Sequence, residues 1–183
     1  MNKISNQLKK WYLKNNYNFP WREQVNPYRV WISEIMLQQT QVKTAIPYYN
    51  KWMTSFKTVE KVALSHIDKI LKHWEGLGYY QRAHNIHTTS QVIVKTFNSS
   101  IPDDYNELIK LNGIGDYTAS AILSIAYNKK YPSIDGNLKR VTSKWTPLGS
   151  RIDNKFATKL CKGVGYSDLD RQGTAGVLYG KYK

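Results

Sequence analysis

The spacing of apolar residues constrains the fold of this chain more than any other feature. Apolar side chains recur every three or four residues in nearly every segment, and no segment alternates apolar and polar residues over the length of a strand. This pattern predicts an all-α protein of about ten or eleven helices. Because the sequence shows neither a flexible Gly/Ser linker nor an internal repeat, we expect the helices to pack as one compact unit.

Several helix starts are marked by residues that commonly cap N-termini. Asn26 precedes Pro27, Thr58 precedes an apolar run, and Ser65 is followed three residues later by Asp68 in the pattern of a capping box. We therefore expect helices to begin close to these positions.

The composition adds a strong positive charge. Lys and Arg number 27 against 13 Asp and Glu, which gives a formal net charge of +14. Such an excess is expected of a protein whose partner is a polyanion, and nucleic acid is the first candidate. Most of the basic residues are lysines, however, and an AT-rich genome produces the same bias.

Two other classes of protein are disfavoured by the sequence. No apolar run reaches the roughly 18 residues of a membrane-spanning helix, and the N-terminus lacks the pattern of a secretory leader, so a soluble intracellular protein is expected. Cys161 is the only cysteine. It cannot form an intramolecular disulfide, and alone it cannot hold a metal or an iron-sulfur cluster.

The most informative segment is a glycine-containing turn between two apolar helices, within Leu108–Leu123. Gly113 and Gly115 can both adopt a positive φ and leave no Cβ in the way of a ligand, while Ile114 can anchor the turn in the core. Backbone N–H groups at the start of the second helix then suit a phosphate oxygen, as in a helix-hairpin-helix that holds DNA without reading its sequence. Asp116, which would repel that phosphate, can instead cap the second helix. An ordinary tight connection between helices is the alternative.

Two acidic residues lie where solubility does not require a charge. Glu34 interrupts the apolar helix predicted over 30–40, and Asp135 directly precedes another predicted helix. Cleavage of the bond between a base and deoxyribose needs a proton for the departing base and negative charge near an oxocarbenium-like sugar. Desolvation raises the pKa of a carboxyl group, which would let Glu34 donate a proton near neutral pH. The alternatives are a Glu on a solvated helix edge and an Asp that caps a helix.

With these elements in order, the chain resembles the MutY-like adenine DNA glycosylases of the helix-hairpin-helix superfamily. The match runs from about Trp11 to Val141 and rests on five motifs in order, namely Phe19–Arg22, Pro27–Val42, Trp74–Tyr80, Gly113–Gly115 and Asp135–Asn137. The resemblance implies that Glu34 protonates the adenine ring and later activates water, and that Asp135 stabilises the sugar cation. Tyr117 and Asn137 would support them in the same site.

The resemblance also implies a set of DNA-binding residues. Gln39 would enter the duplex where the adenine leaves, and Leu77 and Tyr79 would wedge beside the opposite base, which offsets part of the cost of base flipping. A helix-end Gln and core-filling side chains are the alternatives for these positions. The other residues expected to bind DNA are Arg22, Gln38, Gly113, Gly115 and Thr118.

Position 117 bears on the type of reaction. In relatives that cleave the strand, the residue two positions after the second glycine of the hairpin is typically a Lys that forms a Schiff base with the sugar. This chain has Tyr117 there. We therefore expect a monofunctional hydrolase that leaves an abasic site.

A domain organisation follows from the same resemblance. Residues 26–132 would form a six-helix barrel-like domain with the helix-hairpin-helix at about 107–123, and residues 1–25 and 133–183 would form a second helical lobe. Members of the family usually continue into a four-cysteine [4Fe-4S] loop and a C-terminal domain that helps to recognise 8-oxoguanine. This sequence contains neither, so no cofactor is expected.

Together these features predict a base-excision repair enzyme. Its substrate would be adenine mispaired with 8-oxoguanine or guanine in double-stranded DNA, and it would act as a monomer in the bacterial cytoplasm, at the nucleoid, without membrane contact. A thymine or uracil mismatch glycosylase of the same superfamily and a catalytically impaired DNA-binding module are the alternatives.

Overall fold

The computed structural model describes residues 19–131 together with Lys10, Lys14, Ser133, Ile134 and Gly136. Regular structure in residues 19–131 is helical throughout, as the apolar spacing predicts. The helices are α2 (Pro20–Glu23), α3 (Pro27–Leu37), α4 (Val42–Ser55), α5 (Val59–Ala63), α6 (Ile67–Trp74), α7 (Gln81–Thr96), α8 (Tyr105–Leu108) and α9 (Asp116–Ile125).

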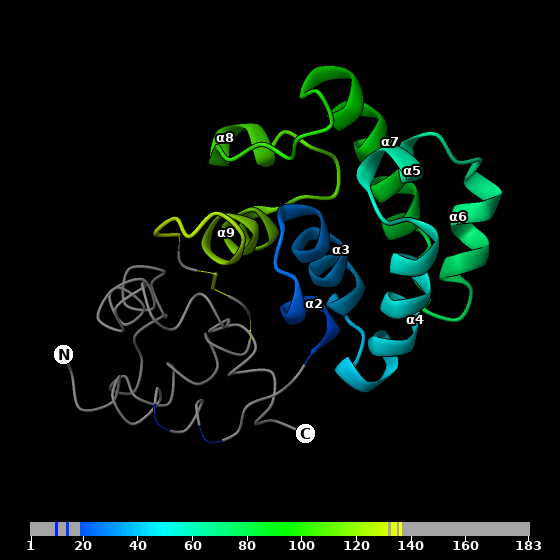
Figure 1. Cartoon of the computed structure of the whole chain (residues 1–183), viewed down its shortest axis with the longest axis horizontal. Helices are drawn as coiled ribbons and strands as arrows, with labels where there is room; N and C mark the ends of the chain where they lie inside the picture. The colour runs from blue at the N-terminus through cyan, green and yellow to red at the C-terminus, as the bar shows by residue number, and fades with distance from the viewer. Residues whose placement is uncertain (1–9, 11–13, 15–18, 132, 135, 137–183) are drawn as a thin grey trace, which may run out of the picture.

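Helix α3 lies at the centre of this arrangement. It contacts α9 on one side and α4 and α7 on the other, as Figure 1 shows. Every residue from Val30 to Leu37 is buried. A helix that is buried on every side can be stable only inside a protein, so α3 forms the axis around which the other helices pack.

The helix starts agree with the capping residues at two of three predicted places. Asn26 caps α3 and its side chain accepts a hydrogen bond from Arg29 N at 2.9 Å, and Thr58 is the N-cap of α5. The start predicted at Ser65 is wrong by one residue, because His66 caps α6 through Nδ1 at 3.4 Å from Asp68 N. The Ser65 hydroxyl instead donates to a carbonyl of the preceding helix.

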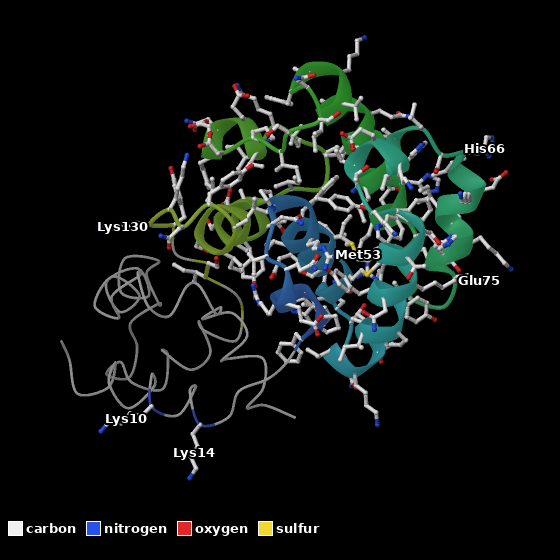
Figure 2. All side chains as sticks on the ribbon, in the orientation of Figure 1. Lys10, Lys14, Met53, His66, Glu75 and Lys130 are labelled. Carbon is white, nitrogen blue, oxygen red and sulfur yellow. The ribbon has the colours of Figure 1, made fainter. Side chains whose placement is uncertain are left out.

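Aromatic side chains join α3 to its neighbours. The Tyr28 hydroxyl donates to Phe56 O at 2.7 Å and accepts from Trp52 Nε1 at 3.0 Å, so one buried phenol links α3 to α4. Trp52 in turn meets Trp74 of α6 edge to face, with ring centroids 5.7 Å apart. Figure 2 shows side chains filling the space between these helices, with Met53 pointing inward.

Most of the predicted second lobe lies outside the described residues. This holds for Asp135, Asn137 and Cys161, and for all of 137–183. Within the part that the structure does describe, each helix falls short of the length and apolar character that crossing a lipid bilayer requires.

Candidate active site

Glu34 occupies the middle of the central helix α3. Its side chain is 3% exposed, and the helix is buried on every side at this level. The alternative of a Glu on a solvated helix edge is therefore excluded. Because burial removes the water that would hydrate a carboxyl group, the protein has to supply partners for it.

One of those partners is Arg22 from the short helix α2. Arg22 Nη2 lies 3.9 Å from Glu34 Oε1, and the Arg22 side chain is 13% exposed. Its Nη1 is buried and has no hydrogen-bond partner among the described residues, so one donor is available to a further acceptor. The sequence predicted that Arg22 binds DNA, but α2 packs against α3 and thereby places this arginine beside the candidate acid.

Tyr117 lies on α9, which packs beside the helix that carries Glu34. It is the second residue of α9, and its side chain is partly buried. Asp135 and Asn137, the other two predicted members of the site, lie outside the described residues. Their roles therefore remain predictions.

The hairpin turn is fixed from behind by α7. Gly113 has a φ of 79°, and a Cβ at this position would lie 2.8 Å from Asn85 Cβ, so both the backbone conformation and the close approach require glycine. Asn112 is held on two sides, since its Nδ2 donates to Asn85 Oδ1 at 3.1 Å and its carbonyl accepts from Thr89 Oγ1 at 2.7 Å. Ile114 is 3% exposed and anchors the turn in the core, as predicted.

Gly115 behaves differently from Gly113. It is the N-cap of α9 with a φ of −92°, so it does not use the positive φ that glycine permits. A Cβ at Gly115 would meet no atom of the described residues within 4 Å. The first hydrogen bond of the α9 ladder runs from Ala119 N to Gly115 O at 2.9 Å, and earlier N–H groups lie outside that ladder. Open space before a helix N-terminus is the arrangement that binds a phosphate.

The side chains of two neighbours of this N-terminus have other contacts in the structure. Thr118 is 2% exposed, so its side chain belongs to the core and only its backbone could contact DNA. Asp116 is the first residue of α9 rather than its cap, and its carboxylate accepts a hydrogen bond from Tyr105 Oη at 3.0 Å.

Two loops carry the residues predicted to enter a duplex. Gln39 is exposed with a φ of 54°, directly after α3, and Gln38 is partly exposed. Tyr79 is 63% exposed with a φ of 48°, between α6 and α7. Leu77 is 7% exposed and packs into the core, which is the alternative considered for it, because the turn directs its side chain inward.

The sequence did not single out two residues that hold these elements in place. Asn85 supports the hairpin turn, and Arg82 binds backbone carbonyls of both loops. The available signal for Arg82 was its position, since an arginine stands on the buried face of α7 one turn before Ile86. The two residues also line a small cleft between the loop after α3 and the hairpin, together with Trp31, Ile35, Gln38, Ile86, Asn112 and Gly113.

The cysteine content of this chain does not fit the iron-sulfur cluster that the resemblance implies. A [4Fe-4S] cluster needs four thiolates, and the 183 residues contain one cysteine. In the described part of the chain, no three His, Cys, Asp or Glu side chains are grouped so as to hold a metal ion.

Comparison with known proteins places this geometry in a family. A family model described as "HhH-GPD superfamily base excision DNA repair protein" matches residues 32–165. The chain is 49% identical over 141 residues to the "Adenine DNA glycosylase" of Buchnera aphidicola subsp. Baizongia pistaciae. This alignment covers 77% of this chain and 40% of the relative. The human protein of the same name is 35% identical over 172 residues, covering 89% of this chain and 32% of the relative. The chain thus spans less than half the length of these relatives.

Solved structures show the same fold at lower identity. The "Structure of a thermostable thymine-DNA glycosylase" aligns with a TM-score of 0.76 at 22% identity, over 94% of this chain and 86% of that one. The "Structure of a non-covalent Endonuclease III-DNA Complex" aligns with a TM-score of 0.75 at 17% identity, over 91% of this chain and 78% of that one. These matches confirm the predicted all-α helix-hairpin-helix fold.

Proposed function

Because this chain belongs to the HhH-GPD superfamily of base excision DNA repair proteins, we propose that it hydrolyses the N-glycosidic bond of adenine in DNA. Its substrate is adenine mispaired with 8-oxoguanine or guanine. The observation that carries the proposal is a carboxyl group buried in the central helix beside an arginine, Glu34 with Arg22. Two relatives that are 49% and 35% identical to it over the aligned segments are both named "Adenine DNA glycosylase".

The reaction needs a proton donor beside the departing base. Glu34 lies in a region shielded from water, where a carboxyl group can transfer a proton to a bound base without competition from solvent. After the base has left, the same carboxylate can take a proton from the attacking water. Arg22 places a positive charge beside the carboxyl group and keeps one donor for substrate. Asp135 supplies the negative charge that stabilises the sugar cation.

The proposed enzyme removes the base without cutting the strand. Tyr117 stands where a Schiff-base lysine would be needed, and a phenol cannot form an imine with the sugar. The product is therefore an abasic site and free adenine. The bond between the sugar C1′ and the adenine nitrogen breaks, and water supplies the hydroxyl on C1′ and, through Glu34, the proton on the base.

The surface around the site suits double-stranded DNA. The open N-terminus of α9 can take a backbone phosphate, and the exposed Gln39 and Tyr79 can enter the base stack as the adenine leaves. We place the protein in the bacterial cytoplasm at the nucleoid, where it acts as a monomer without a metal cofactor.

The test is a panel of four duplexes that carry A:8-oxoguanine, A:G, T:G or U:G. Each is incubated with the protein and then treated with alkali, which cleaves the strand at abasic sites. We expect product only from the two adenine duplexes. Product from T:G or U:G would instead identify a thymine or uracil mismatch glycosylase, and tight binding without product would identify a DNA-binding module.

A further inference from the structure

We propose that Arg82 is a positioning residue that couples the loop after α3 to the turn before α7, so that Gln39 and Tyr79 enter the duplex together. This inference rests on the proposed function, because it concerns how the base is extruded. Arg82 touches neither the base nor the sugar in this proposal. It acts through the backbone of the two loops that carry the intruding side chains.

One half of the guanidinium holds the end of α3. Arg82 Nη1 donates to the carbonyl oxygens of Ile35 at 2.9 Å, Met36 at 3.1 Å and Gln38 at 2.6 Å. Both Nη atoms also lie 3.3 Å from Thr40 Oγ1. Ile35 O also accepts from Gln38 N at 3.3 Å, whereas the contacts of Arg82 with Gln38 O and Thr40 Oγ1 bracket Gln39 from both sides.

The other half holds the turn between α6 and α7. Arg82 Nη2 donates to Leu77 O at 3.2 Å and to Gly78 O at 3.1 Å. The guanidinium carbon also lies 5.6 Å from the centroid of the Tyr79 ring and 5.2 Å from that of Trp74, within the range of cation–π attraction. A single planar group therefore contacts both loops and one of the intruding rings.

Backbone strain coincides with these contacts. Gln39 and Tyr79 have φ values of 54° and 48°, which non-glycine residues rarely adopt and which persist only where the surroundings hold them. In each loop, Arg82 binds the carbonyl of the residue immediately before the strained one, Gln38 or Gly78. The two strained conformations thus share one support.

The side chain is suited to this task by its shape. Arg82 is 8% exposed, so its charge is compensated by carbonyl oxygens and aromatic rings rather than by water. The planar fork presents donors in several directions at once, whereas a lysine carries all its donors on one nitrogen. Lysine at this position could reach one loop and would leave the other loop without its support.

The test compares Arg82→Lys with the wild type in two measurements. Circular dichroism first establishes that both proteins are folded at the assay temperature. The first is the single-turnover rate on an A:8-oxoguanine duplex at saturating protein. The second is the fluorescence of 2-aminopurine placed opposite 8-oxoguanine, which rises on unstacking and requires no cleavage. We expect a rate lower by about 10- to 100-fold, in keeping with a displacement of about 1 Å in the loops. We also expect a smaller fluorescence rise and a DNA dissociation constant within about threefold of wild type.

Two further variants complete the experiment. Thr40→Val removes one acceptor on the first loop and should give a smaller loss in the same direction, even if Arg82→Lys does not fold. Lys95→Met removes one charge from an exposed position of the same helix and should leave both measurements unchanged. Wild-type rate and fluorescence in folded Arg82→Lys would overturn the proposal, and so would a wild-type protein that binds the duplex without unstacking the probe. Unstacking without product would overturn the proposed function alone.

Discussion

Arg22 and Glu34 place a positive group and a carboxyl group side by side in the candidate site. Their nearest charged atoms are 3.9 Å apart, which is close enough for strong attraction in a partly buried place but too long for a direct hydrogen bond. Arg22 Nη1, which has no hydrogen-bond partner among the described residues, can therefore donate to a third molecule. An adenine bound beside these two side chains would meet a proton donor and a cation together.

Substitution of Arg22 by Met tests whether this arginine serves the acid or the DNA. We expect the single-turnover rate to fall by at least about tenfold, because Glu34 loses its positive neighbour. The dissociation constant for the duplex should change by less than about threefold, since Arg22 is largely buried. A weakened affinity with an unchanged rate at saturation would instead support the DNA contact that the sequence predicted.

Alanine substitutions at the two hairpin glycines should affect different properties, DNA affinity at Gly115 and stability at Gly113. Gly115→Ala adds a methyl group in open space with a permitted φ, so the free energy of unfolding should change by less than about 1 kcal/mol. That methyl group would stand where a phosphate approaches, so affinity for DNA should fall. Gly113→Ala should lower the free energy of unfolding by about 1–2 kcal/mol because of its φ of 79° and the contact with Asn85.

The free energy of unfolding is measured by urea denaturation, and the affinity for DNA by fluorescence anisotropy of a labelled duplex. Equal effects of the two substitutions on stability and on affinity would contradict the distinction drawn between a structural and a ligand-facing glycine.

At the scale of elements, the central helix α3 was the most predictable part of the chain. Its apolar string predicted the helix, but left open whether Glu34 lies on a solvated edge or in the core; the structure shows that it is buried. The hairpin turn was also predictable, because an apolar Ile114 between two glycines indicates a turn that is anchored in the core. The caps at Asn26 and Thr58 were read correctly from local chemistry alone.

The elements that escaped prediction depend on backbone geometry. Leu77 was expected to face DNA but is buried, because its direction is set by the turn around it, with φ values of 99° at Gly76 and 71° at Gly78. The sequence could not predict the role of Arg82, because its partners are mainly backbone carbonyl groups, which every residue has. The loop conformations that gather those carbonyls arise only when α3, α6 and α7 are packed.

The junction between α3 and α4 gives a stability prediction. Tyr28→Phe leaves Phe56 O and Trp52 Nε1 without the hydroxyl that joins them, and each unsatisfied buried group costs about 1–3 kcal/mol. We expect the free energy of unfolding to fall by about 2 kcal/mol or more, as measured by urea denaturation. Tyr80→Phe, at a position that is 45% exposed, is the matched control and should be nearly neutral.

The same junction predicts how stability responds to alkali. Burial raises the pKa of Tyr49 to about 12, and burial also raises the pKa of Tyr28, whereas an unfolded tyrosine ionises near pH 10. The contribution of these neutral phenols is therefore fully present below about pH 10 and is lost as the pH rises through the folded values. The unfolding free energy should decline between about pH 10 and 12, and less steeply in Tyr28→Phe. An equal slope in both proteins would contradict this assignment.

At the scale of the whole molecule, the hairpin, the two loops and the candidate acid are held by one core. Helix α3 contacts both α9 and α7, so the end of the hairpin and the turn at Tyr79 are set by the same central helix (Figure 1). Exposed ends of α6, marked by His66 and Glu75 in Figure 2, lie at the outer edge away from α9. A rigid scaffold of this kind can hold a duplex in one register while a base is extruded.

The charge of the whole chain predicts a steep dependence of DNA affinity on salt. With a net charge of +14 and a hairpin proposed to contact backbone phosphates rather than bases, much of the binding free energy should come from released counterions. For six or more phosphate contacts, the affinity for an undamaged duplex should fall by about a thousandfold between about 50 and 200 mM salt. An affinity that stays flat over this range would show that phosphate contacts are few.

The central claim is that Glu34 performs the excision, and its substitution by Gln tests this most directly. Gln keeps the size of the side chain but cannot donate or accept a proton as a carboxyl group does. The measurement is the single-turnover yield of alkali-labile product from an A:8-oxoguanine duplex, with binding to the same duplex followed in parallel. The account predicts product with the wild type, none with Glu34→Gln, and similar binding by both. Unchanged turnover in the folded variant would contradict it.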